Sequence, residues 1–401
     1  MSSLVVEESR GREAFNALRD EWQALFAETA APPFLSWAWV SAWHAAFGQH
    51  LTPRIFCARE AGRLVGLLAL CEEEQRLVRL RLRRLAFLGE GEGGADYLDV
   101  LAQPGRETEI AETICHHLAR EVSFDVIELH AMAADSPSLP IFAQRFNQAG
   151  CSRRFISGEV CPQIELAETW DEVLKASHRS TNFKRRLNYL RKLDGFERRV
   201  ITAPEEARAA FDRFLVLHEQ RWAAQGGSDA MGRQAIRNFH RDAVERLARE
   251  GLLRFEELWI EGECRASLYG MEYGGRFYYY QTGHDQEWIK RSVGLVLLGL
   301  SIEDAVERGL KVYDLLRGSE TYKFDWATGT RRLVTLQVTG CSVAAVLFTT
   351  RSKLKTAARE AARELLPESA VEFVRRLRRR RERRQDVKTL KEPQTALSRT
   401  A

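Results

Sequence analysis

The sequence predicts an α/β protein with mixed sheets, built from two tandem copies of one domain and followed by a basic helical tail. The chain has 401 residues, more than one ordinary hydrophobic core accommodates. Its second half repeats the order of helices and strands expected in its first half. Its charge is segregated, because residues 351–401 contain 16 Lys and Arg against 7 Asp and Glu, whereas the whole chain is only +4.

The first half begins with apolar residues at helical spacing over 10–28. Two prolines then open a second, aromatic helix over 31–48. A hairpin follows, because two apolar runs are separated by a short turn that contains Gly62. The elements predicted after the second helix are strands at 54–60, 64–74, 83–89, 95–102 and 124–132 and a helix at 107–121.

The second half repeats this pattern after two helical segments. Gly262 marks the turn of its hairpin, and Gly274–Gly275 signals the turn before the next strand. Gly309 suits the C′ position of the long helix that follows. The predicted elements are helices at 178–193 and 205–227, strands at 252–260, 264–273 and 276–283, a helix at 292–308 and a closing strand at 310–318.

The two halves can be aligned on their hairpins, which places Gly62 over Gly262. We therefore expect one domain at 1–165, a second at 166–345 and a tail at 346–401. Within the tail, the run 375–384 has eight Arg in ten residues.

Composition argues against several other classes of protein. The N-terminus lacks the basic and apolar regions of a signal peptide, and no apolar run is long enough to span a bilayer. The seven cysteines are scattered without a C-x-x-C pair, and His116 and His117 lie on an amphipathic helix. We therefore expect a cytoplasmic protein with reduced thiols and no metal site.

The start of the predicted helix at 292–308 has the composition of an anion site. The first N–H groups of a helix have no intrahelical acceptor, and the positive end of the helix dipole lies there. The alternative is an ordinary loop whose basic residues are solvated. The candidate phosphate-binding residues are Lys290, Arg291, Ser292, Val293, Gly294 and Leu295.

Polar side chains also follow two strands at the edge where open α/β sheets bind ligands. Asp285 and Glu320 are candidate general bases, because aromatic neighbours would raise the pKa of a carboxyl. Lys323 is a candidate for stabilising a developing oxyanion, and Tyr322 beside it is a further candidate catalytic residue. The candidate substrate-binding residues are Tyr280, Trp288, Asp314, Arg317 and Trp326.

Each of these catalytic assignments has a structural alternative. Asp285 is alternatively a turn residue. Glu320 alternatively forms an ion pair with Arg317 or Lys323, and Lys323 is alternatively a surface lysine. The basic helix at 178–193 is a candidate for contact with an anionic acceptor, a tRNA or a membrane, or else it is a solvated face.

The order of hairpin, strand, basic loop, helix and strand resembles the GNAT acyltransferase superfamily. The segment "RSVGLV" (291–296) is similar to its phosphate loop, Q/R-x-x-G-x-G/A, with Val296 in place of the last small residue. Over residues 34–326 the chain further resembles the duplicated GNAT family named for CelD, a protein associated with bacterial cellulose biosynthesis. That family is similar to the FemAB peptidoglycan aminoacyltransferases. The motifs that carry this resemblance are "PFLSWAWVSAWHAAFG", "ADYLDVLA", "YYYQTGHDQEW", "GLVLLGLSIEDAVERGL" and "YDLLRGSETYKFDWA".

The resemblance implies direct transfer of an acyl group, expected to be acetyl, from acyl-CoA to an amine or hydroxyl. The acceptor would be a sugar, a lipid-linked intermediate or a small molecule in envelope or exopolysaccharide synthesis. In FemAB-type relatives the donor is aminoacyl-tRNA, and a lysine matching Lys323 lies at the transfer centre. A FemAB-like aminoacyltransferase and a non-catalytic component of a polysaccharide machine stay open as alternatives.

The first half and the basic tail are expected to have supporting roles. The first half has no phosphate loop and is expected to be structural or to bind the acceptor. The basic tail lies outside the resemblance and has no recognised nucleic-acid fold. It is a candidate for electrostatic contact with an anionic membrane or a partner, which would place the protein at the periphery of the inner membrane, or else it is a passive solubilising tail.

Overall fold

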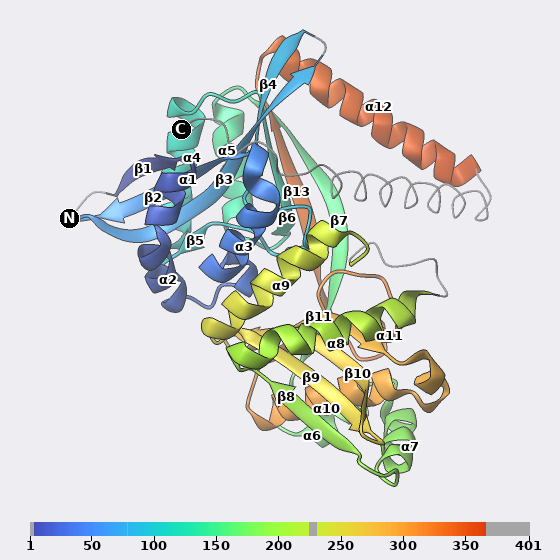
Figure 1. The fold of residues 1–401 in the computed structure, drawn as a ribbon. Coiled ribbons are helices and arrows are strands. Elements are labelled where there is room, and N and C mark those ends of the chain that lie inside the picture. Colours follow the sequence, from blue (N-terminus) through green and yellow to red (C-terminus); the bar gives the residue numbers. More distant parts are fainter. Residues whose placement is uncertain (1–3, 78, 224–230, 366–401) are drawn as a thin grey trace, which may run out of the picture.

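The computed structural model describes residues 4–365, apart from 78 and 224–230. It confirms an α/β fold with a large mixed sheet (Figure 1). The elements of the first half, with η for a 3₁₀ helix, are β1 Val5–Arg10, α1 Arg12–Ala17, α2 Arg19–Ala27, η1 Pro33–Leu35, α3 Trp37–Phe47, η2 Gly48–His50, β2 Thr52–Glu60, β3 Arg63–Leu77, β4 Leu80–Phe87, β5 Leu101–Ala102, α4 Glu107–Glu121, β6 Val126–Ala133, α5 Ser138–Gln148 and β7 Ser152–Glu165. Those of the second half are α6 Trp170–Ala176, α7 Ser180–Leu190, β8 Glu197–Ile201, α8 Pro204–Ala223, α9 Gln234–Arg249, β9 Leu253–Ile260, β10 Glu263–Tyr273, β11 Arg276–His284, η3 Gln286–Arg291, α10 Val293–Glu307, β12 Val312–Asp314, α11 Thr321–Phe324, β13 Gly329–Thr339 and α12 Val343–Leu365.

The predicted duplication is visible in the backbone. Each half has a hairpin, a third strand, a helix, and a strand that runs parallel to the third one. In both halves this parallel pairing, β4 with β6 and β11 with β12, extends over three residue pairs. The hairpin turns also agree, because Ala61–Gly62 and Glu261–Gly262 all have positive φ.

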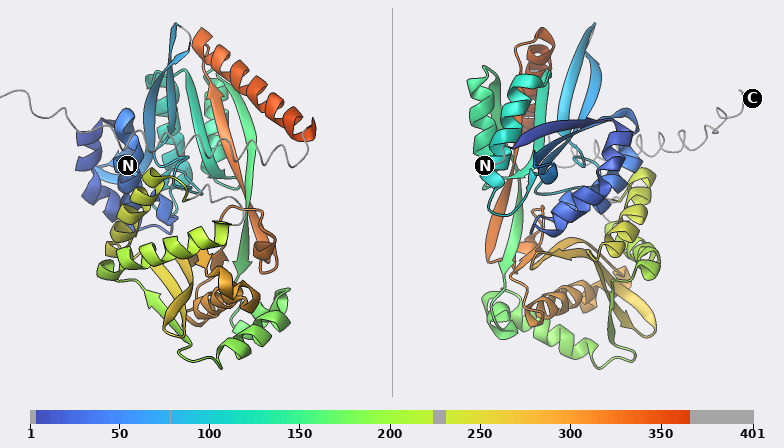
Figure 2. Two further views of the ribbon diagram at one scale, coloured as in Figure 1. Left: turned by 45° about the vertical axis from the view of Figure 1, so that its right-hand side comes forward. Right: turned by 90° about the vertical axis from the view of Figure 1, so that its left-hand side faces the viewer.

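Two long strands join the halves into one sheet of order β1-β2-β3-β4-β6-β13-β7-β12-β11-β10-β9-β8, with β5 paired to β3. Strand β7 pairs with β13 along most of its length and with β12 at its end. Strand β13, from the end of the second half, lies between β6 and β7. Figure 2 shows both strands running from the upper part of the molecule towards the lower part. The sheet of the first half is therefore completed by a strand from near the C-terminus.

Two strand predictions are wrong. Of the segment 95–102, only Leu101–Ala102 is a strand, because Tyr97 has φ +59 and turns so that its hydroxyl donates to Asp314 at 2.9 Å. The segment 310–318 is a strand only over Val312–Asp314, since Leu316 has φ +53. It is also not the closing strand, a place taken by the unpredicted β13.

Two large hydrophobic cores pack against the sheet, and a small third cluster lies beneath α12. The larger contains Trp22, Trp39 and Phe142 and reaches into the second half through Phe211 and Phe239 of α8 and α9. The smaller lies between the sheet, α7 and α10. In the second half, α10 therefore packs on the face of the sheet opposite to the face that α8 and α9 cover (Figure 1).

The C-terminal helix α12 is attached at its start, where Phe348 packs near Leu82 and Val126. The tail is thus helical to Leu365, and the arginine run at 375–384 lies outside the described residues. In the part of the chain that the structure describes, no helix has the length and apolar character needed to cross a bilayer.

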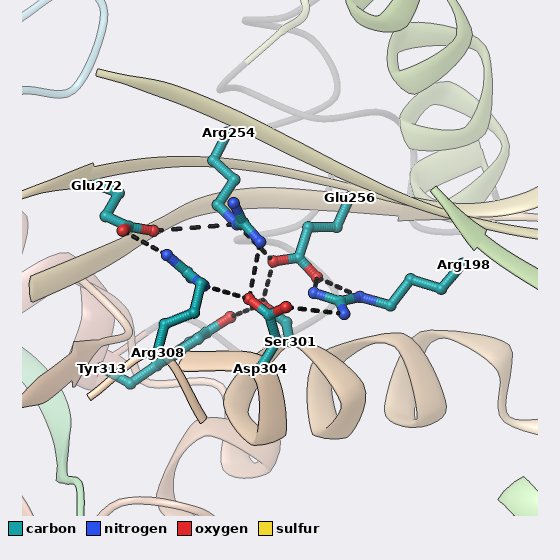
Figure 3. A network of polar contacts seen from close by, with 8 residues as sticks. All are labelled: Arg198, Arg254, Glu256, Glu272, Ser301, Asp304, Arg308 and Tyr313. Atoms are coloured by element: carbon teal, nitrogen blue, oxygen red, sulfur yellow. Dashed lines mark hydrogen bonds and ion pairs between the residues drawn. The ribbon is translucent and has the colours of Figure 1, made fainter. Parts of the chain in front are cut away.

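A buried network of charges fixes α10 on the sheet (Figure 3). Glu256, which is fully buried, accepts hydrogen bonds from Arg198 at 2.8 Å and from Ser301 of α10 at 3.0 Å. Asp304, one turn further along α10, accepts from Arg254 at 2.7 Å and from Arg198 at 3.1 Å. The other members of the network are Glu272, Arg308 and Tyr313. Because α10 is anchored near its C-terminal end, the direction of its N-terminus is set.

We expect Glu256→Ala to lower the free energy of unfolding by about 1–3 kcal/mol, because it removes the buried acceptor of Arg198 and Ser301. The partly buried arginines keep Asp304 as a counter-charge, which limits the loss. Urea denaturation followed by circular dichroism measures this loss. Glu307→Ala, an exposed glutamate on the same helix, is the matched control and should change stability little. Equal effects of the two substitutions on the free energy of unfolding would contradict a stabilising role for Glu256.

Candidate active site

The site begins where β11 and β12 part. The two strands pair in parallel from Arg276–Val312 to Tyr278–Asp314, and no further pair follows. Strand β11 continues to His284, whereas the segment that follows β12 turns away at Leu316. Beyond Tyr278, the backbone groups of β11 that face away from β10 are thereby left without a partner strand. They lie at the carboxyl end of the strands, where open α/β sheets bind ligands.

A pocket of about 250 Å³ occupies this opening. Strand β11 and α10 form two of its walls, and η3, α7, α8, α11 and the residues that flank these helices contribute the rest. Its lining residues are Arg179, Asn182, Arg221, Tyr279, Thr282, His284, Ile289, Ser292, Val293, Gly294, Leu295, Leu298, Tyr322 and Trp326.

The N-terminus of α10 lines one side of the pocket. Ser292 has the left-handed conformation that starts the helix, and the first intrahelical bond runs from the Val296 N–H to the Ser292 carbonyl. The N–H groups of the preceding turn therefore have no intrahelical acceptor. A Cβ at Gly294 would lie 3.3 Å from Nδ1 of His284, so glycine permits this close approach of helix and strand. The arrangement favours an anion.

Two arginines add positive charge to the pocket. Arg221, near the end of α8, donates to the Thr282 carbonyl at 2.9 Å, and its guanidinium lies 5.5 Å from the Tyr322 ring centroid. Among the described residues, no carboxylate forms an ion pair with Arg221. Arg179 is paired with Asp325 at 2.8 Å. The positive charge of Arg221 is thus available to a ligand.

Three side chains in the pocket can handle protons. The hydroxyls of Tyr279 and Tyr322 lie 3.3 Å apart. Burial raises the pKa of Tyr279 well above its usual value, so its hydroxyl stays protonated and can donate. Burial and the nearby Arg221 lower the pKa of His284 to about 4, which leaves a neutral imidazole near pH 7. Its Nδ1 has no hydrogen-bond partner among the described residues and can accept one.

The structure divides the predicted phosphate-binding residues into two groups. Ser292, Val293, Gly294 and Leu295 line the pocket. Lys290 and Arg291 do not: Lys290 is exposed, and Arg291 stacks on the ring of Trp288 at 4.0 Å. Arg265 also lies over Trp288, at 4.8 Å, and this tryptophan does not line the pocket.

Asp285 has the contacts of a turn residue. Its Oδ1 accepts from the Glu287 N–H at 2.9 Å and caps η3, and its Oδ2 accepts from Arg265 at 2.9 Å. Both oxygens are therefore engaged in holding the loop before α10.

Lys323 and Glu320 form an ion pair, with Nζ and Oε2 3.3 Å apart. This is the structural alternative to a general-base role for Glu320. Lys323 is 5% exposed, which rules out a surface lysine. Its ammonium also donates to the carbonyl of Arg317 at 2.6 Å. In this structure Lys323 holds the loop after β12, and neither residue lines the pocket, although Tyr322 and Trp326 on either side do.

The remaining predicted residues lie at the junction of the two halves. The hydroxyl of Tyr280 donates to the Gly93 carbonyl, and Arg317 binds Asp96. Asp314 accepts from Tyr97 at 2.9 Å and from Gln163 at 2.5 Å. Burial raises the pKa of Asp314 to about 6. These residues connect the loop at 89–97 to the second half.

Sequence reasoning missed several residues of the pocket. Tyr279 had a signal, because in a strand it must face the side opposite to Tyr278 and Tyr280. The basic helix α7 was considered for anions, but not as a wall of this pocket. Arg221 and His284 carry no local signal. The missed lining residues are Arg179, Asn182, Arg221, Tyr279, Thr282, His284, Ile289 and Leu298.

We expect Lys323→Met to lower the free energy of unfolding by about 1–3 kcal/mol, because it removes the donor of a buried hydrogen bond to the Arg317 carbonyl and the partner of Glu320. Urea denaturation measures the change, and Lys290→Met, at an exposed lysine, is the control. A Lys323 variant as stable as the control would contradict the positioning role.

Among the residues whose side chains the structure describes, no group of three or more His, Cys, Asp and Glu forms a metal site.

Comparison of the sequence with protein families matches residues 177–324 to the acetyltransferase (GNAT) domain. This range includes every residue of the pocket except Trp326. Curated protein sequences give no match.

Solved structures show the same fold over most of the chain. FemX superposes with a TM-score of 0.54 and 11% identity, covering 78% of this chain and 95% of its own. A conserved protein of unknown function from Bacteroides thetaiotaomicron gives 0.52 and 10%, covering 81% and 97%. The C-terminal domain (DUF2156) of a putative lysylphosphatidylglycerol synthetase from Agrobacterium fabrum gives 0.50 and 9%, covering 84% and 96%. Residues 177–324 are thus similar to the GNAT acetyltransferase domain, and the chain has a fold like that of FemX.

Proposed function

We propose that the protein transfers an acyl group, acetyl in the simplest case, from acyl-CoA to an amine or hydroxyl. The observation that carries this proposal is the pocket between the parted strands β11 and β12, where the N-terminus of α10 meets Arg221. The match of residues 177–324 to the GNAT acetyltransferase domain supports it. The anionic diphosphate of the donor would lie at the N–H groups of Val293, Gly294 and Leu295.

The residues in the pocket have the properties that direct transfer needs. An open N–H of β11 beyond Tyr278 would donate to the thioester oxygen as negative charge develops there. The acceptor would attack the carbonyl carbon, the C–S bond would break, and a tyrosine hydroxyl would protonate the leaving thiolate. Neutral His284 would accept the proton of the attacking group and then release it to solvent, and the tyrosinate would be reprotonated from solvent.

A second candidate is aminoacyl transfer from aminoacyl-tRNA. The shared fold with FemX and the exposed basic residues of α7 beside the pocket, Lys184 and Arg185, favour it. The membership of a CelD-like branch, a role in exopolysaccharide synthesis and contact of the tail with an anionic membrane stay predictions of the sequence.

Isothermal titration calorimetry with acetyl-CoA tests the first proposal. We expect wild-type protein to bind, and Arg221→Gln to bind at least tenfold more weakly, because a charge-assisted contact is worth about 1.5–3 kcal/mol. Arg145→Gln, on α5 away from the pocket, should bind as the wild type does. Absence of binding by the wild type, or full affinity of Arg221→Gln, would contradict the proposal.

A further inference from the structure

The C-terminal helix α12 has an apolar stripe that nothing in the described part of the chain covers. Its first turns are held on the sheet, and Figure 1 shows the rest of the helix leaving the body of the protein. Because an α-helix has about 3.6 residues per turn, the residues of the stripe lie on one face. They are between 45% and 68% exposed, and they are Val343, Val346, Leu347 and Leu354. Single exposed apolar residues need no explanation, but a contiguous stripe of them indicates a binding surface.

Basic residues border this stripe. Arg351 and Lys353 lie between Leu347 and Leu354 in the sequence, and helical spacing places them on opposite sides of the apolar face. Both are exposed, and neither forms an ion pair among the residues whose side chains the structure describes. An apolar face bordered by Lys and Arg is typical of helices that lie in the interface of an anionic membrane.

The hairpin of β3 and β4 adds a second basic feature at the same end of the molecule. Its tip lies beside the start of α12 in all three views (Figures 1 and 2). Arg76 and Arg81 are directly opposite each other in the ladder, and Arg79 lies in the turn between the strands. All three are exposed, and within the described residues none has a carboxylate partner. Like charges opposite each other destabilise a hairpin, and an anionic surface would offset this repulsion.

The occupant of this surface must be apolar and anionic at once. A second copy of the chain would place the same basic residues against each other in a symmetric contact, which is unfavourable. A nucleic acid would neutralise the charge but leave the apolar stripe in water. An anionic bilayer supplies both phosphate groups for the arginines and an acyl boundary for the stripe.

We propose that α12 and the tip of the β3–β4 hairpin dock the protein on the phosphate headgroups of an anionic bilayer. The apolar stripe of α12 enters the boundary between headgroups and acyl chains, and the arginines of the hairpin contact the phosphates. This inference goes beyond acyl transfer and does not depend on it. The candidate active site lies in the second half, away from α12 and the hairpin (Figure 1), so docking would leave it open to a soluble donor.

Co-sedimentation of the full chain with vesicles tests the apolar stripe. We expect vesicles of phosphatidylcholine and phosphatidylglycerol in equal parts to bind at least tenfold more tightly than phosphatidylcholine alone. Leu354→Glu should weaken binding to the mixed vesicles at least tenfold, because it removes a buried apolar group and adds a charge of the same sign as the lipid. Val216→Glu, at a similarly exposed valine of α8, is the matched control and should bind as the wild type does.

Arg81→Glu tests the hairpin in the same assay. It should weaken binding to the mixed vesicles at least tenfold, although the fold gains a favourable cross-strand pair with Arg76. Arg19→Glu, at an exposed arginine of α2, is its control and should leave binding intact.

Three results would overturn the docking surface. The first is equal binding, or no binding, of the wild type to the two kinds of vesicle. The second is wild-type affinity in both Leu354→Glu and Arg81→Glu, which would assign the attraction to the arginine run at 375–384 alone. The third is a dimer in light scattering that Leu354→Glu abolishes while vesicle binding is unchanged, which would assign the stripe to a second copy of the chain.

Discussion

The parting of β11 from β12 after three residue pairs is the constraint on which the rest of the site depends. It leaves backbone groups of β11 open and makes room for the first turn of α10 beside them. The charge network around Glu256 holds the other end of that helix on the sheet (Figure 3). Lys323 ties down the loop that leaves β12, which brings Tyr322 to face Tyr279. Each of these contacts preserves one wall of the pocket.

The duplication has produced an opening near the end of the parallel strand pair in each half. In the second half, the parted strands meet a helix N-terminus and Arg221, whereas the corresponding strands of the first half meet Glu90 and a glycine-rich loop. Strands β7 and β13 cross between the halves, so the two openings belong to one continuous sheet.

Local pattern predicted much of the fold but only part of the site. The helix expected at 107–121 coincides with α4, and both hairpin turns lie at the glycines that were aligned. Strand β13 was missed, since its place between β6 and β7 depends on pairing across some 200 residues of chain. For the same reason the sequence predicted Arg291, and not Arg221, as the arginine of the anion site. A basic residue next to a helix start has a local signal, whereas one carried in from α8 depends on tertiary packing.

Hydrogen exchange measured by mass spectrometry, with and without acetyl-CoA, locates the donor site most directly. The account predicts slower exchange in peptides that cover 279–284 and 292–296, because ligand would engage the open N–H groups of β11 and α10. Peptides that cover the start of α4 should be unchanged. Protection at α4 instead, or no protection in either region at saturating acetyl-CoA, would contradict the central claim.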